Sequence, residues 1–172
     1  QDREFANLQD QALARAQSLT QLSNRLAGNH AQIYELLRTA ETGADEGEFY
    51  DAGKPYLFAI HDIEAALETE LQLQGLAASE MTALSSLLEQ TAAYRLNTTN
   101  AMLMATVNLA LARTVMGNST EMFNRLNAEF SAANQAVHVR LDEQLVEHRK
   151  RTKDQTRLFT FLFVAAIVIA LA

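Results

Sequence analysis

The stretch Tyr94–Asn100 (YRLNTTN) holds the densest group of polar side chains within any expected helix. Arg95 and Thr98, together with Thr91, fall at positions of a seven-residue repeat where apolar residues would stabilise a helical core more. The guanidinium of Arg95 is a planar fork of donors that suits a carboxylate, and threonine hydroxyls can add hydrogen bonds to it. The pattern predicts a ligand site for a small organic acid or amino acid between helices, with Tyr94 beside it.

A structural role for the same side chains is the alternative, and the sequence favours it. Arg95 would then pair with a glutamate of a neighbouring helix, because structural ion pairs are commoner than binding sites. Polar residues at core positions also fix the register of packed helices. Arg15 and Asn29 are the polar exceptions on the apolar stripe of the first helix. Asn29 is kept as a candidate ligand-binding residue, although we expect it to set register.

Other kinds of chemistry find little support in the sequence. The histidines are scattered without the spacing of metal ligands, so we expect surface or helix-flanking roles for His30, His61, His138 and His148. The acidic stretch Ala44–Gly53 lacks the ligand pattern of a calcium loop and is expected to be solvated. The chain has no cysteine, and no catalytic triad, carboxylate pair or phosphate-binding pattern occurs. We expect no enzyme activity, no cofactor and no metal.

The elements that must position these residues are helices. The 172 residues include one proline and six glycines, too few turn residues for a β or α/β protein. We expect glycines and Pro55 to interrupt helix over Thr42–Pro55, Gly75 to end one helix and Gly117 to end another. Since the second helix is shorter than the others, either Thr42–Pro55 holds helical pieces of its own or the long helices extend beyond the bundle. Apolar residues three and four positions apart predict four helices, which are Phe5–Ala40, Tyr56–Leu76, Ser79–Met116 and one from Asn118 onward. The predicted fold is an all-α, antiparallel, up-down-up-down four-helix bundle.

The last residues, Leu158–Ala172, carry no charge and are apolar on every side. A membrane span needs about 20 apolar residues, but a helix packed in a soluble bundle keeps a polar face and this run has none. The apolar stripe of the fourth helix continues into the run in the same phase. We therefore expect residues 1–157 to form the bundle domain and residues 158–172 to be the start of a truncated transmembrane helix.

Charge is distributed unevenly along the chain, whose net charge is −7. Residues 1–139 contain 8 Lys/Arg and 17 Asp/Glu, whereas residues 140–172 contain 6 and 4. An acidic body excludes nucleic acid as a partner, since phosphates need basic surfaces. Basic residues before the apolar run favour the cytoplasmic side, but the first span usually sets orientation, and we expect such a span before Gln1.

Two stretches carry a resemblance to a known family. Leu22–Ala40 (LSNRLAGNHAQIYELLRTA) resembles the first helix of the extracytoplasmic four-helix-bundle sensor module of bacterial chemoreceptors and related histidine kinases or cyclases. Tyr94–Leu126 resembles its third helix and turn. The resemblance implies a periplasmic sensor of a small-molecule ligand, anchored in the bacterial inner membrane and often a homodimer, which passes a helix displacement across the membrane. A cytosolic tail-anchored adaptor and a ligand-free dimerisation bundle are the alternatives.

Overall fold

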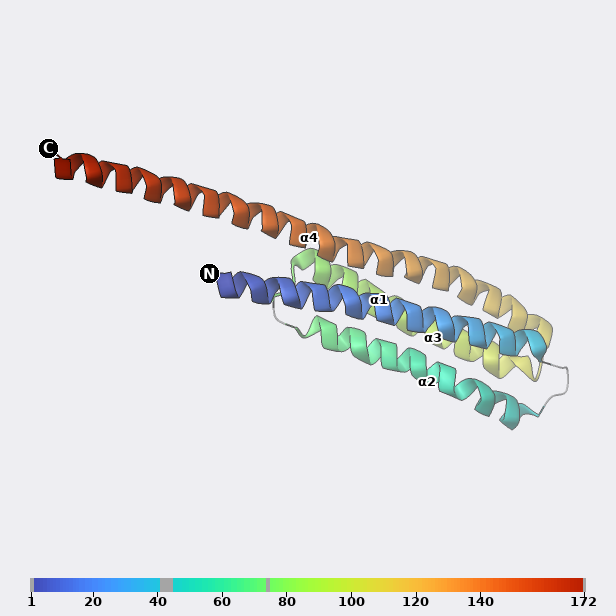
Figure 1. Ribbon diagram of the computed structural model, residues 1–172. Coiled ribbons are helices and arrows are strands. Elements are labelled where there is room, and N and C mark those ends of the chain that lie inside the picture. Colours follow the sequence, from blue (N-terminus) through green and yellow to red (C-terminus); the bar gives the residue numbers. More distant parts are fainter. Residues whose placement is uncertain (1, 41–44, 74, 172) are drawn as a thin grey trace. The chain divides into compact units, whose positions relative to one another are not determined.

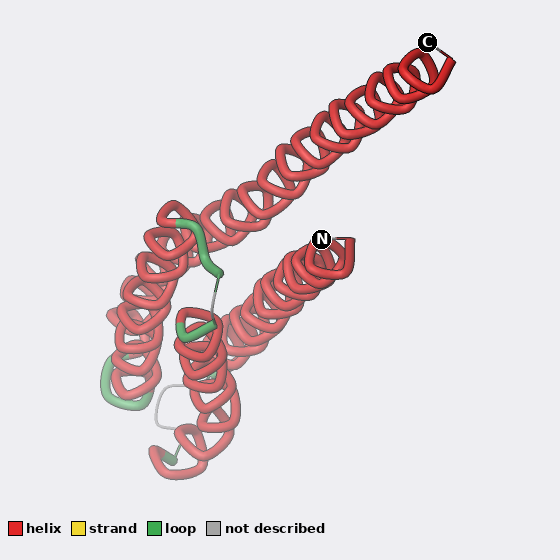
Figure 2. Tube along the Cα trace, turned by 90° about the vertical axis from the view of Figure 1, so that its left-hand side faces the viewer, coloured by secondary structure: helices red, strands yellow, loops and turns green. Residues whose placement is uncertain are grey.

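The computed structural model describes residues 2–40, 45–73 and 75–171, and within them all side chains except those of residues 2–5, 46, 148, 154 and 156–171. This part of the chain is helical, with short loops and no strand (Figure 2). The helices are α1 (Asp2–Thr39), α2 (Glu46–Leu71), α3 (Ala78–Ala105) and α4 (Leu109–Leu171) (Figure 1). The prediction of an all-α fold with four helices packed against one another is confirmed.

The chain divides into two compact units. The first, Gln1–Val137, contains α1, α2, α3 and the beginning of α4, and we call it the core unit. The second, His138–Ala172, contains the rest of α4. All the packing and polar contacts described below lie within the core unit, apart from one ion pair between Glu147 and Arg151 in the second.

The interior of the core unit is filled by apolar side chains from all four helices. Large side chains that are almost fully inaccessible to solvent include Leu19, Leu26, Ile33, Ile60, Ile63, Leu67, Leu84, Leu87, Met102, Leu126 and Phe130. They recur at three- and four-residue spacing, which places them on one stripe of each helix. Burial of these stripes supplies most of the free energy that holds the helices together.

At one position in each of two helices, the residue that faces the core is the neighbour of the predicted one. The sequence placed Asn29 at the core of α1, but the buried residue there is His30. In α3 the buried residue is Tyr94, and Arg95 lies half-buried beside it. Because an α-helix has 3.6 residues per turn, a seven-residue repeat marks the core-facing side only approximately, and either of two adjacent positions can be the buried one.

The predicted start of the second helix is wrong, since α2 begins at Glu46 rather than near Tyr56. The Asp45 carboxylate accepts a hydrogen bond from the backbone N–H of Glu48 at 3.0 Å, which satisfies one of the free donors at the helix start. Pro55 lies inside the helix. The acidic stretch is therefore helical from residue 46 onward and not a solvated loop, while residues 42–44 lie outside the described part.

The predicted boundary between the third and fourth helices is also wrong. The chain turns at residues 106–108, and Gly117 lies within α4. Asn108 accepts a hydrogen bond through Oδ1 from the backbone N–H of Leu111 at 3.0 Å, so it caps α4. At the α2–α3 turn, Gly75 has a positive φ of 82°, and the Glu80 carboxylate accepts from the Ala77 N–H at 2.8 Å. That capping contact fits the predicted helix start near Glu80.

Helices α2 and α3 approach each other closely at Gly53. A Cβ atom at this position would collide with Cε of Met102 and would lie 3.4 Å from Cδ2 of Leu36. Met102 is itself almost fully buried. The absent side chain of Gly53 thus leaves the space that the methionine fills.

No helix within the described residues combines the length and the hydropathy that a membrane crossing requires. The predicted span, Leu158–Ala172, lies outside the residues whose side chains are described.

Candidate functional site

Arg95 forms an ion pair between α3 and α2. Its Nε donates to Oε1 of Glu64 at 2.7 Å, and Oε2 of Glu64 lies 3.3 Å from Nδ1 of His61. The Glu64 side chain is buried, whereas the Arg95 side chain is 37% exposed. The structure thus contains the interhelical pair that the structural alternative for Arg95 predicts.

Tyr94 connects α3 to α1 and α4 through a buried aromatic layer. Its hydroxyl lies 2.9 Å from Nδ1 of His30, within hydrogen-bonding distance. The imidazole of His30 stacks on the ring of Phe123, with centroids 4.2 Å apart and planes inclined by 4°. The expected surface or helix-flanking position of His30 is therefore wrong, because the buried side of α1 includes His30 at the point where the repeat had placed Asn29.

The remaining predicted site residues are brought together only in part. Thr91 and Thr98 are fully buried on the same stripe of α3 as Tyr94. The hydroxyl of Thr91 donates to the Leu87 carbonyl at 2.7 Å, and that of Thr98 makes no hydrogen bond of standard geometry with the part of the chain that the structure describes. Asn29 is half-buried on α1. Thr91, Tyr94 and Thr98 thus form a polar stripe on α3 with Arg95 at its edge, Asn29 belongs to α1, and the role of all five in binding stays a prediction.

Burial keeps both partners of the His30–Tyr94 pair uncharged at neutral pH. It raises the pKa of the Tyr94 hydroxyl above its ordinary value, and a weaker interaction with Thr98 acts in the opposite direction. Burial lowers the pKa of the His30 imidazole, since a protonated ring would lose its hydration. The aromatic layer therefore holds a histidine that resists protonation while the core unit is folded.

We expect acid to destabilise the core unit through His30. Above the ordinary histidine pKa of about 6.5 both the folded and unfolded states hold a neutral ring. As the pH falls below that value the unfolded state binds the proton first, so the free energy of unfolding decreases until the lowered pKa of the folded state is passed. Urea unfolding followed by circular dichroism from about pH 8 to about pH 5 measures this slope.

The variant His30→Gln should show a shallower decrease of unfolding free energy over the same range, because it lacks the buried titrating ring. His138, which is exposed on α4, gives the matched control His138→Gln with a slope like that of the wild type. Equal slopes for His30→Gln and the wild type would contradict the prediction.

A second polar cluster joins the start of α3 to α1 and to the end of α2, and the sequence did not identify it as a site. Nε of Arg15 lies 3.6 Å from Oε2 of Glu70, and its Nη1 lies 3.5 Å from Oε2 of Glu80. Arg15 is only 6% exposed, and Glu80 is also buried. The signal in the sequence was Arg15 itself, a charged residue at a core position of the first helix.

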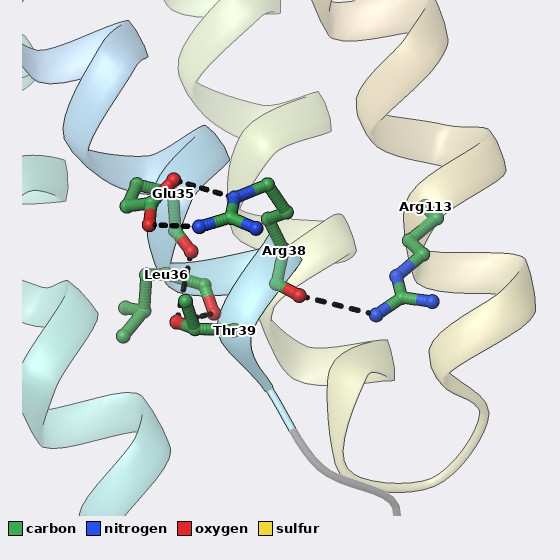
Figure 3. Close-up of polar contacts among 5 residues, drawn as sticks. All are labelled: Glu35, Leu36, Arg38, Thr39 and Arg113. Carbon is green, nitrogen blue, oxygen red and sulfur yellow. Dashed lines mark hydrogen bonds and ion pairs between the residues drawn. The ribbon is translucent and has the colours of Figure 1, made fainter.

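Polar contacts at the end of α1 are exposed, and all but one lie within the helix itself (Figure 3). The guanidinium of Arg38 donates twice to the carboxylate of Glu35, at 2.7 and 2.6 Å. The Arg38 carbonyl accepts from Nη2 of Arg113 at 3.3 Å, and the Thr39 hydroxyl donates to the Glu35 carbonyl at 2.9 Å. These contacts satisfy carbonyl groups at the helix end and join it to α4.

Comparison with protein-family models, with curated proteins and with solved structures gave no significant match. The residues and geometry of the chain itself therefore carry the functional proposal.

Proposed function

We propose that the chain is the extracytoplasmic ligand-sensing domain of a bacterial transmembrane signalling receptor, of the chemotaxis or two-component type. In this proposal the core unit lies in the periplasm and the end of α4 enters the inner membrane. The observation that carries the proposal is the single helix α4, which starts among the packed helices and ends in the apolar run after residue 157. A continuous helix is suited to transmit a displacement between two such environments.

An antiparallel, up-down-up-down order of the helices belongs to the same proposal. It is supported by contacts in which low residue numbers of one helix meet high numbers of its neighbour. The contacts are Thr20–Asn134 and His30–Phe123 for α1 with α4, and Gly53–Met102 and Glu64–Arg95 for α2 with α3. In such a bundle both ends lie at one pole, which is the geometry of a domain placed between two membrane spans.

The sensing step in this proposal is a shift between two arrangements of the helices. A small organic or amino acid bound near Arg95, Thr98, Thr91, Tyr94 and Asn29, or at the interface of a homodimer, would favour one arrangement by its difference in affinity. The ion pair of Arg95 with Glu64 favours the competing function, a ligand-free dimerisation bundle. The basic residues that precede the apolar run favour a cytosolic tail-anchored adaptor.

The side of the membrane on which the core unit lies decides between sensor and adaptor. Because the chain has no cysteine, a thiol introduced into it reports the location of the core unit when labelling is compared with that of the receptor without the introduced thiol. Ser131 is exposed on α4, so Ser131→Cys in the receptor expressed in bacteria should react with a membrane-impermeant maleimide before the inner membrane is lysed. The buried position in Ala133→Cys is the matched control and should react only after unfolding.

Labelling of Ser131→Cys that requires lysis of the inner membrane would place the core unit in the cytosol and exclude the sensor. If the thiol is periplasmic, the unfolding temperature of the chain with organic and amino acids separates a sensor from a ligand-free bundle. A ligand that raises this temperature should lose its effect in Arg95→Ala if the predicted residues bind it.

A further inference from the structure

Four cationic side chains lie within five residues of α4, before the uncharged run at the end of the chain. We call them the basic collar, and they are Arg149, Lys150, Arg151 and Lys153. All four are exposed. The collar lies wholly within the second compact unit, so its charges belong to a single helix.

Neighbouring acidic residues compensate only one of these charges. The guanidinium of Arg151 donates to the carboxylate of Glu147, one turn earlier in the helix. The other three collar residues make no ion pair with any side chain that the structure describes. The next charged residues, Asp154 and Arg157, carry opposite charges and cancel in the sum. Four cations less the one paired with Glu147 leave three uncompensated positive charges.

The collar extends around the helix and is not confined to one face. Successive residues of an α-helix differ in direction by about 100° and in height by about 1.5 Å. Arg149, Lys150 and Arg151 therefore point to three different sides of α4, and the whole collar occupies about 6 Å of its length. A protein packed against α4 would contact a stripe about 100° wide and leave part of these charges uncompensated. A layer of headgroups that the helix crosses meets all of them at once.

The height of the collar along α4 fits a headgroup layer. The uncharged run begins five residues after Lys153, which corresponds to about 8 Å of helix. The polar region on each side of a bilayer is about 5–8 Å thick, and long basic side chains reach further along the helix. If the uncharged run enters the hydrocarbon, the collar therefore lies at the level of the lipid phosphates.

We propose that the basic collar binds the headgroups of anionic phospholipids where α4 enters the bilayer. The lipid phosphates accept hydrogen bonds from Arg149, Lys150 and Lys153, while Arg151 keeps its bond to Glu147. The inference rests on the proposed function only for the entry of α4 into a membrane, and it adds the class of lipid that surrounds this helix. The side on which the core unit lies does not matter, because the collar meets the headgroups of whichever leaflet α4 enters first.

Electron paramagnetic resonance of spin-labelled lipids tests the proposal. The 172-residue chain is reconstituted in phosphatidylcholine vesicles that contain a small amount of labelled lipid, and the spectrum separates lipid held at the protein from free lipid. Labelled phosphatidylglycerol should associate with the chain about five-fold more strongly than labelled phosphatidylcholine. Raising potassium chloride from about 0.05 M to about 0.5 M should reduce this preference, because the Debye length falls.

A collar variant should lose the preference. It combines the substitutions Arg149→Gln, Lys150→Gln and Lys153→Gln. Glutamine removes the uncompensated charges and keeps a good helix propensity, so the two labelled lipids should associate equally. The matched control makes the same change of charge at exposed positions of the core unit and should keep the five-fold preference. It combines Arg25→Gln, Lys54→Gln and Arg125→Gln.

Equal association of the two lipids with the unchanged chain would overturn the proposal and leave an acidic protein surface as the partner of the collar. A preference that persists in the collar variant, or that is lost in the control, would overturn it as well. Potassium phosphate and potassium chloride of the same ionic strength should reduce the preference equally. A larger effect of phosphate would identify a site for the free ion and also contradict binding of a headgroup layer.

Flotation of the same vesicles separates this proposal from the proposed function. A chain that floats with the vesicles and shows no lipid preference refutes binding by the collar and leaves the proposed receptor intact. A chain that does not float refutes both, since α4 then does not enter the bilayer. A cytosolic core unit, found by thiol labelling, would exclude the sensor and leave the lipid preference unaffected.

Discussion

Replacing Arg15 by alanine is expected to lower the free energy of unfolding of the core unit by about 3–5 kcal/mol. The substitution leaves Glu70 and Glu80 in a largely buried place without the cation that faces them. Removing one partner of a buried ion pair costs far more than the pair contributes relative to apolar residues, because the remaining charge is uncompensated. Urea unfolding followed by circular dichroism measures the change.

The control for this experiment is Arg25, an arginine of the same helix. Its Nη2 lies 3.9 Å from Oδ2 of Asp62, and both side chains are about half exposed or more. Exposed pairs of this kind contribute about 1 kcal/mol or less, so Arg25→Ala should change little. A loss for Arg15→Ala no larger than the loss for Arg25→Ala would show that the cluster does not stabilise the fold.

Tyr94→Ala should be comparably severe, with a loss of about 3–5 kcal/mol of unfolding free energy. The ring is fully buried, so its removal leaves a cavity at the layer where α1, α3 and α4 meet. Tyr94→Phe keeps the ring and removes only the hydroxyl that bonds to His30, and we expect a loss of about 1–3 kcal/mol. The same urea titration measures both variants.

Leu96 offers the matched control on the same helix. It is 62% exposed, so Leu96→Ala should change the free energy of unfolding by about 0.5 kcal/mol or less. If Tyr94→Phe costs as much as Tyr94→Ala, the hydrogen bond and not the ring would be the source of the stability at this layer.

The helices themselves could be predicted because apolar periodicity is a local property of the sequence. Leu19, Leu22, Leu26 and Leu84 were assigned to the core and are buried there. The helix boundaries were harder to predict, since a single glycine such as Gly117 is tolerated inside a long helix. The side chains that do cap α2 and α4, Asp45 and Asn108, act through contacts with residues three positions later and gave weaker signals.

A polar site could be predicted only where a charged residue occupies a core position of an otherwise apolar helix stripe. Arg95 and Arg15 both stand out as charges on apolar stripes, and both make ion pairs between helices. The partners of Arg15 could not be predicted, because Glu70 and Glu80 flank a turn and meet it only after the helices pack. His30 was misplaced for another reason, since a shift of one position in the repeat decides between the surface and the core.

The side chain of Met102 fills the space left by Gly53, and this contact opposes sliding of α2 along α3. Sliding one helix along the other by a turn, about 5.4 Å, would bring Phe49 or Leu57 opposite the methionine, and neither leaves room for it. We therefore expect α2 and α3 to move together, and any sliding of helices within the core unit to occur where this pair packs against α1 or α4.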